Sequence, residues 1–223
     1  MKTTILITGT SRGIGKALAL HFLSQGATVI GSSRKTQPEL AHYPKFFSLE
    51  LDLSNPESRA NAMHRVKENF DNIDILINNA GIGPDIDHCS PSESDLEDTL
   101  RVNLMGTILF TEELIDHIKL KGKIINISSK MGSITFCEKS DSVAYRVSKA
   151  ALNMYTQMLS VRVKKGLTIA AVHPGWVRTS FAPSNINGRL TATEAARKIH
   201  SFVTKPFKSG IFWDVETNQE IPW

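Results

Sequence analysis

The chain of 223 residues has a formal net charge of +4, with 41% hydrophobic and 22% charged residues. These fractions are close to those of ordinary globular proteins and argue against disorder or a fibrous repeat. The length leaves room for one sizeable core, so we expect a single domain over residues 1–223. Lysines and arginines are spread along the chain instead of forming one block, which favours a solvated surface over a nucleic-acid partner.

No apolar stretch approaches the roughly 20 residues that a membrane-spanning helix needs. The short apolar start at residues 4–7 is followed too soon by Gly9 to be a signal peptide. We therefore expect no membrane span and a cytoplasmic location. Cys89 and Cys137 lack the spacing of a disulfide framework or a zinc site, so we interpret both as structural and expect no metal.

Short apolar runs alternate with longer segments of helical periodicity. Strands are expected at residues 3–8, 28–32, 46–51, 73–78, 123–128, 168–173 and 211–214, and helices at 13–24, 57–70, 93–119, 144–165 and 193–204. Several strands are apolar nearly throughout, as strands buried on both faces must be. The pattern predicts a parallel sheet between two helix layers, with ligands bound at the carboxyl ends of its strands. Helix caps are expected in Ser54-Asn55-Pro56 before Glu57, and at Thr191 or Thr193.

The first strand runs directly into a glycine-rich turn and then into a helix. Its glycines permit a tight turn, close approach of the backbone to a pyrophosphate, and close packing of helix on strand. The helix start adds unpaired N–H groups and a positive dipole, which suit phosphate. Such a turn alone is often only structural, but the order strand, turn, helix favours a dinucleotide site. That site is predicted to include Gly9, Ser11, Arg12, Gly13, Ile14 and Gly15.

The residues after the second strand bear on which dinucleotide binds. An acid there would accept hydrogen bonds from a ribose 2′-hydroxyl and repel a 2′-phosphate, but the chain places Ser33, Arg34 and Lys35 there. Arg12 faces the same corner, and two guanidinium groups suit bidentate contact with a phosphate. The sequence therefore favours NADP(H). NAD(H) stays open if Arg34 and Lys35 are ordinary loop charges.

Four motifs in chain order together resemble those of the short-chain dehydrogenase/reductase family. They are T-G-x-x-x-G-x-G at residues 8–15, Asn78-Asn79-Ala80-Gly81, Tyr145-x-x-x-Lys149 and Pro174-Gly175. The resemblance implies a Rossmann-type, doubly wound α/β fold with a parallel sheet of about seven strands and helices on both faces. It also implies hydride exchange between a nicotinamide and a small carbonyl or alcohol. Further cofactor contacts are implied for Asp52, Leu53, Asn79, Ala80, Gly81, Tyr145, Lys149, Pro174, Gly175, Val177 and Thr179.

Tyr145 and Lys149 are four residues apart on a predicted helix, so their side chains share a face. A free phenol with a pKa near 10 is a poor acid or base near neutrality. A nearby ammonium and an oxidised nicotinamide would favour the phenolate and lower the pKa of Tyr145. Without the nucleotide motif, a surface pair of Tyr and Lys would be the better interpretation; with it, we predict Tyr145 as general acid and base.

The resemblance assigns three more residues. Ser129, after the fifth strand, matches the serine that orients the substrate oxygen. The gap from it to Tyr145 is 16 residues (145 − 129), longer than is usual in the family, so Ser133 stays open as an alternative. Asn103 matches the residue whose backbone helps to hold a water linked to Lys149. His173 is interpreted as a spacer at a strand end.

The runs at residues 145–154, 173–177 and 209–223 resemble the C-factor-like subgroup, which includes carbonyl-reductase relatives. That subgroup supplies the main alternative function, a signalling or interaction protein in which catalysis is secondary. A nucleotide-sugar epimerase or dehydratase is less favoured, because such enzymes generally carry a larger carboxyl-terminal substrate region. The short stretch 181–189 predicts a trimmed lid, and therefore an open pocket or a small substrate. Helices 93–119 and 144–165 resemble those that join family subunits into homodimers or homotetramers.

Overall fold

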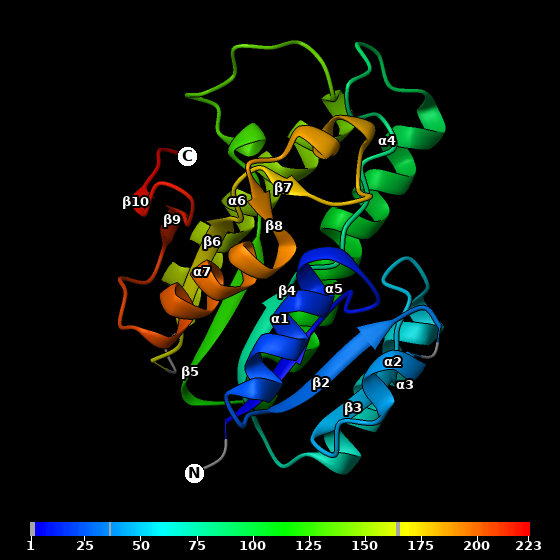
Figure 1. The fold of residues 1–223 in the computed structure, drawn as a ribbon, viewed down its shortest axis with the longest axis vertical. Coiled ribbons are helices and arrows are strands. Elements are labelled where there is room, and N and C mark those ends of the chain that lie inside the picture. Colours follow the sequence, from blue (N-terminus) through cyan, green and yellow to red (C-terminus); the bar gives the residue numbers. More distant parts are fainter. Residues whose placement is uncertain (1–2, 36, 164–165) are drawn as a thin grey trace.

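The computed structural model describes residues 3–35, 37–163 and 166–223 (Figure 1). Its main sheet has eight strands in the order β10-β9-β6-β5-β4-β1-β2-β3. They are β1 Thr4–Ile7, β2 Thr28–Ser33, β3 Phe46–Glu50, β4 Ile73–Asn78, β5 Ile118–Ile127, β6 Thr168–His173, β9 Ile211–Asp214 and β10 Gln219–Glu220. All pairs in this sheet are parallel except β9 with β10. The strand order reverses beside β1, which lies between β2 and β4.

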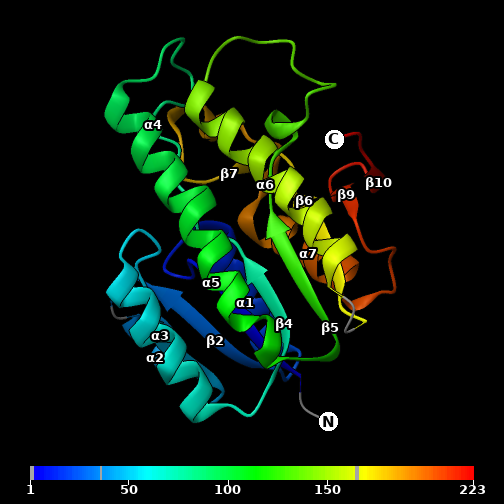
Figure 2. The same ribbon diagram turned by 180° about the vertical axis from the view of Figure 1, so that it is seen from behind.

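Helices cover both faces of the sheet. Figure 1 looks onto α1 (Gly13–Ser24) and α7 (Ala192–Thr204), and Figure 2, from behind, looks onto the helices of the other layer. That layer holds α3 (Pro56–Asn69), α4 (Glu93–Leu100), α5 (Thr107–Leu114) and α6 (Val143–Arg162). Successive residues of β1 alternate between the two layers: Ile5 and Ile7 pack with α1 and α7, and Leu6 packs with α3, α5 and α6. The predicted doubly wound α/β fold is confirmed.

Several small elements escaped prediction. A two-stranded sheet pairs β7 (Val177–Arg178) with β8 (Leu190–Thr191), β10 adds an antiparallel edge, and α2 spans Pro38–Ala41. Two-residue strands and one-turn helices carry too few residues to show a period. A short 3₁₀ helix, Pro183–Asn187, lies in the stretch predicted as a trimmed lid.

The predicted helix at 93–119 is wrong in its interior and at its end. It divides into α4, a π-helical turn at Arg101–Gly106, α5 and a 3₁₀ turn at Ile115–His117, after which Ile118 already begins β5. Gly106, in the π-turn, lies close to a neighbouring loop, because an added Cβ there would lie 2.2 Å from the carbonyl oxygen of Leu53. The backbone comes this close to a neighbouring loop, and periodicity alone does not record such an approach.

The helix ends agree more closely with the sequence. Asn55 caps α3, and Thr191, not Thr193, caps α7 in a capping box with Glu194. Helix α6 ends at Arg162, so the expected continuation to residue 163 is wrong, and residues 164–165 lie outside the described residues.

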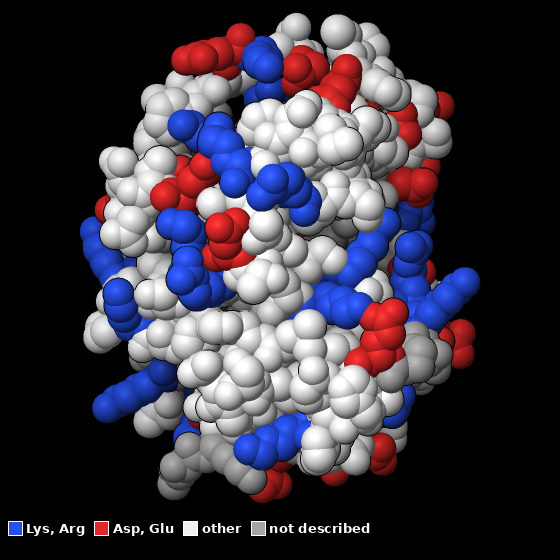
Figure 3. Space-filling model, in the orientation of Figure 1, with Lys and Arg blue, Asp and Glu red and all other residues white. Residues whose placement is uncertain are grey.

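Two surface features complete the fold. Cys89 and Cys137 are free and exposed, so our interpretation of them as structural side chains is wrong. Lys and Arg side chains are interspersed with Asp and Glu over the face in Figure 3. Among the described residues, no helix is both long enough and apolar enough to cross a membrane.

Candidate active site

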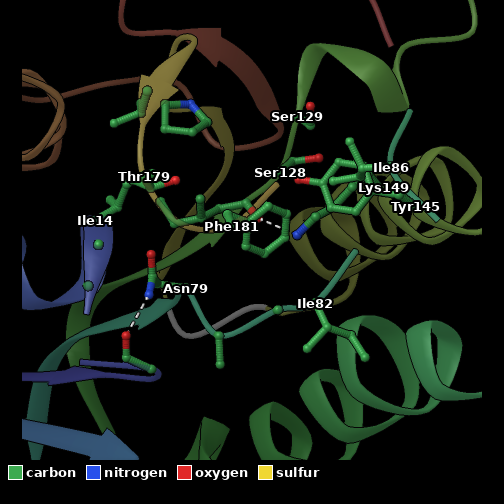
Figure 4. Close-up of a pocket in the computed structure, with 18 of the residues that line it drawn as sticks. Ile14, Asn79, Ile82, Ile86, Ser128, Ser129, Tyr145, Lys149, Thr179 and Phe181 are labelled. Atoms are coloured by element: carbon green, nitrogen blue, oxygen red, sulfur yellow. Dashed lines mark hydrogen bonds between the residues drawn. The ribbon is translucent and has the colours of Figure 1, made fainter. Parts of the chain in front are cut away.

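A pocket of about 1070 Å³ opens at the carboxyl ends of the central strands, where the strand order reverses. Every predicted site residue except Asn103 lines it. These residues are Gly9, Ser11, Arg12, Gly13, Ile14, Gly15, Ser33, Arg34, Asp52, Leu53, Asn79, Ala80, Gly81, Ser129, Tyr145, Lys149, Pro174, Gly175, Val177 and Thr179. Figure 4 shows Ile14, Asn79 and Thr179 toward one end and Ser128, Ser129, Tyr145 and Lys149 toward the other.

The glycine-rich turn is interlocked with the loop after β4. The Thr8 hydroxyl accepts the N–H groups of Asn79 and Ala80, both at 3.0 Å, and the Asn79 amide donates to the carbonyls of Thr8 and Gly9. Gly9 has a φ of +76°, and an added Cβ would lie 2.9 Å from the Cα of Ala80. At Gly15 a Cβ would lie 2.1 Å from the Gly9 oxygen. A side chain at Gly9 or Gly15 therefore has no room, which fixes the shape of the turn.

The start of α1 is suited to an anion. Arg12 is its N-cap residue but makes no side-chain capping bond, and the first turn carries no acid. Helix N-termini leave backbone N–H groups without intrahelical partners, and these groups attract phosphate. The Arg12 guanidinium donates to the Ser180 hydroxyl at 3.2 Å, and exposed Arg34 lines the same pocket. This donor set fits a phosphorylated dinucleotide.

Asp52 brings a carboxylate to this end of the pocket. Its Oδ1 atom accepts hydrogen bonds from the N–H and the hydroxyl of Ser54, at 2.9 and 2.6 Å. The carboxylate is therefore held in place just after β3, where the family resemblance implies a cofactor contact.

The other end of the pocket brings Tyr145 and Lys149 of α6 against Ser129 at the end of β5. The Lys149 Nζ atom lies 5.6 Å from the centroid of the Tyr145 ring and donates to the carbonyl of Ile127 at 2.9 Å. The Ser129 hydroxyl lies beside the Tyr145 side chain and acts to lower the pKa of that phenol.

Burial dominates the ionisation of both groups on α6. It raises the pKa of Tyr145 to about 12, against the opposing effect of the Ser129 hydroxyl, and it lowers the pKa of Lys149 to about 8. The expected lowering of the Tyr145 pKa by Lys149 is therefore not found in the chain itself. The phenol keeps its proton near neutrality, the form that a proton donor needs.

The two candidate serines have different surroundings. Ser133 is buried, donates to the carbonyl of Pro222 at 2.8 Å and accepts the N–H of Phe136 at 3.4 Å. It does not line the pocket, whereas Ser129 lines it and meets Tyr145. The geometry thus favours Ser129 as the residue that contacts a substrate oxygen.

Asn103 lies behind the pocket wall, in the π-helical turn. Its amide holds the backbone of Ile82 from both sides, accepting the N–H and donating to the carbonyl at 2.8 Å each. The same amide donates to the Ser148 hydroxyl at 3.1 Å. Asn103 therefore braces the loop that follows Gly81 and does not touch the pocket.

Sequence reasoning missed the apolar lining of the pocket and did not place His173 in it. Ile82, Ile86, Phe136 and Phe181 line the pocket, and the Phe181 ring lies edge-on to Tyr145 with centroids 5.7 Å apart. These residues stand on loops outside any motif; their only signal is that each follows a motif-bearing segment. His173 also lines the pocket, and burial lowers its pKa to about 4.

A doubly wound sheet with this nucleotide-type turn and a Ser, Tyr and Lys cluster beside it defines a Rossmann-type oxidoreductase. The family described as short chain dehydrogenase matches residues 3–189, and the chain belongs to this family.

Relatives support the same assignment. A 3-oxoacyl-[acyl-carrier-protein] reductase from Aquifex aeolicus is 37% identical over 187 residues, which are 79% of this chain and 74% of the relative. The NADPH-bound carbonyl reductase from chicken fatty liver superposes with a TM-score of 0.90 at 26% identity, covering 100% of this chain and 95% of that one. A protein described as a short-chain dehydrogenase/reductase, from Burkholderia multivorans and with bound NADP, superposes with a TM-score of 0.89 at 30% identity. The match covers 100% of each chain.

Proposed function

We propose that this protein is an NADP(H)-dependent carbonyl reductase that interconverts a small carbonyl compound and its alcohol, with Tyr145 as general acid and base. The observation that carries the proposal is the presence, in one pocket, of the Ser129, Tyr145 and Lys149 cluster together with the uncapped start of α1. The first group suits proton transfer to a carbonyl oxygen, and the second suits a phosphorylated cofactor.

The cofactor end follows from the donors already described. Backbone N–H groups at the start of α1 would hold the pyrophosphate, and Arg12 with Arg34 would hold a 2′-phosphate. Two structural relatives contain NADP or NADPH, which supports this choice. When bound, the reduced nicotinamide supplies the hydride.

The catalytic end divides the work among three side chains. Ser129 orients the substrate carbonyl through its hydroxyl, and Tyr145 donates the phenolic proton to the carbonyl oxygen. Lys149, with a pKa near 8, is mostly charged at neutrality and would hold the cofactor ribose. Ile82, Ile86 and Phe181 line the same region with apolar surface, which limits the access of water.

Replacing Tyr145 by Phe tests the proposal. With NADPH and a panel of aromatic and aliphatic aldehydes and ketones, we expect kcat to fall by about 10²–10⁴-fold, because proton donation is lost. The Kd for NADPH should change much less than kcat, since the phosphate donors are intact and the variant removes only the phenolic hydroxyl. Steady-state kinetics and fluorescence titration measure the two quantities.

Tyr155→Phe is a matched control on the same helix. The Tyr155 hydroxyl donates to Glu112 at 2.8 Å, and Tyr155 does not line the pocket, so this variant should keep the parental kcat. Turnover undiminished in Tyr145→Phe would remove Tyr145 from the mechanism. A parent protein that reduces none of the carbonyls with either nucleotide would reject the function itself.

A further inference from the structure

Helix α6 begins in an unusual way, just before its catalytic tyrosine. Ser142 stands at the N-cap position but has left-handed backbone angles, with a φ of 57°, and its side chain makes no capping bond. The carboxylate of Asp85 takes its place. One oxygen accepts the N–H of Ala144 at 2.6 Å, and the other accepts the N–H of Tyr145 at 3.2 Å. The cap therefore comes from the loop between β4 and α4.

Asp85 is completely buried, with 0% of its surface exposed. A buried carboxylate is costly unless hydrogen bonds and an opposite charge compensate it. Here the two N–H groups and the positive end of the helix dipole do so. The negative charge of Asp85 is thus compensated by the first turn of α6.

Further hydrogen bonds join the two segments around this cap. The Ser142 hydroxyl accepts the N–H of Asp87 at 3.1 Å, and the Ser142 N–H donates to the carbonyl of His88 at 2.8 Å. Residues 85–88 and 142–145 therefore meet through four hydrogen bonds. The same loop also lines the pocket through Ile82 and Ile86.

The remainder of α6 is fixed independently of Asp85. Lys149 donates to Ile127 at 2.9 Å, and Asn153 accepts the Ser128 hydroxyl at 2.6 Å. A helix that loses its cap frays at its first turn, where N–H groups lack intrahelical partners. Loss of Asp85 should therefore loosen the backbone of Tyr145, the third residue of the helix, and leave Lys149 one turn further on in place.

We propose that Asp85 is a positioning residue for Tyr145: its carboxylate fixes the first turn of α6 and so places the phenol against the substrate oxygen. Asp85 is not among the residues that line the pocket, so it acts through Tyr145. The proposal rests on the proposed role of Tyr145 as proton donor. A misplacement of about 1 Å in a reacting group can reduce a rate by about a hundredfold, so a change in this cap should lower the rate of catalysis.

The test compares Asp85→Ala with Asp85→Asn. We expect kcat to fall by about ten- to a hundredfold in the alanine variant, with an unchanged Kd for NADPH, since Tyr145 is displaced and the nucleotide donors are not. The asparagine variant should retain more activity, because its amide oxygen still accepts one N–H. Amide hydrogen exchange should accelerate at residues 143–146 and stay slow at 149–153.

Ser92→Ala is the matched control. Ser92 caps α4 by accepting the N–H of Asp95 at 3.1 Å and is not among the residues that line the pocket, so its loss should lower the melting temperature without lowering kcat. An Asp85→Ala enzyme with parental kcat would overturn the positioning role. So would a loss of kcat accompanied by equal loss of NADPH affinity and by fast exchange along the whole helix. If the alanine variant does not fold, the asparagine variant alone carries the comparison.

The two proposals fail in different ways. If the parent reduces none of the carbonyls, the proposed function fails, and if Tyr145→Phe is as active as the parent, the proposed role of Tyr145 fails, whatever the Asp85 variants do. If Tyr145→Phe is inactive while Asp85→Ala and Asp85→Asn both match the parent, only the positioning role fails.

Discussion

Burial raises the pKa of Tyr145 and lowers the pKa of Lys149, and each shift makes the free energy of unfolding depend on pH. The unfolded chain holds the Lys149 proton up to a pKa of 10.5, whereas the folded chain releases it near 8. Unfolding therefore takes up a proton between about pH 8 and pH 10.5, and the free energy of unfolding increases as the pH rises through that range. The gain is lost as the pH falls through 8.

We predict that the melting temperature of Lys149→Met depends less steeply on pH between about 8 and 10 than that of the parent, because the linked proton is gone. Differential scanning fluorimetry over this range measures the slope. Lys67→Met, at an exposed position on α3, is the control and should keep the parental slope. Equal slopes in the parent and in Lys149→Met would contradict the lowered pKa of Lys149. Tyr145, with its raised pKa, acts in the opposite sense only above pH 10.

Arg34 gives a second prediction at this scale. If it contacts a 2′-phosphate, Arg34→Ala should weaken NADPH binding by about tenfold or more, the size expected for a charge-assisted hydrogen bond. NADH binding should stay the same. Lys35→Ala is the neighbouring control, because Lys35 is exposed and does not line the pocket. Equal weakening of NADPH and NADH binding would show that Arg34 does not discriminate between them.

At the scale of elements, Ser133 ties the segment before α6 to residues 221–223. Ser133 donates to the carbonyl of Pro222, as described above. In addition, the Thr135 hydroxyl donates to the Trp223 oxygen at 3.4 Å, and the Trp223 ring stacks on Phe212. Phe136 packs against this cluster and lines the pocket. The apolar wall around a substrate is thus held by residues nearly 90 positions further along the chain.

We expect Ser133→Ala to lose about 1 kcal/mol, which is about 2–4 °C in melting temperature for a chain of this size. It should also raise KM for aromatic carbonyls, because Phe136 is less firmly held, while the Kd for NADPH stays constant. Ser160→Ala removes an exposed hydroxyl that bonds to Gln157 at 2.7 Å and should change neither constant. An unaltered KM in Ser133→Ala would mean that Phe136 is held by other contacts.

What could be predicted from the sequence follows from the range of the interactions involved. Helix α1 and strands β4, β6 and β9 have the predicted bounds, because period and apolar runs are local signals. The π-helical turn includes the close approach of Gly106 to Leu53, and the cap of α6 comes from Asp85. Such contacts between distant segments leave no local pattern. Motifs marked the polar site residues, whereas Phe136 and Phe181 carry no motif.

At the scale of the whole molecule, the nucleotide pocket joins segments from residue 9 to residue 189, so its occupation should stabilise the fold as a unit. Ligand at 100 times its Kd adds about 2.7 kcal/mol to the free energy of unfolding. For a chain of this length we expect a rise of about 5–10 °C in melting temperature with NADPH. Inorganic phosphate at the same concentration is the control, and an equal rise with phosphate would argue against a dinucleotide site.

The glycine-rich turn and the loop after β4 are so close that a Cβ at Gly9 has no room between them. The apolar residues that line the pocket, in contrast, lie on loops. Tolerance to sequence change is therefore unevenly distributed over this molecule. Variants at Ile86, Phe136 or Phe181 should alter which compounds enter the pocket without disturbing the half formed by the glycine-rich turn. Directed evolution toward new substrates should accordingly accumulate accepted changes on these loops and almost none between Gly9 and Gly15.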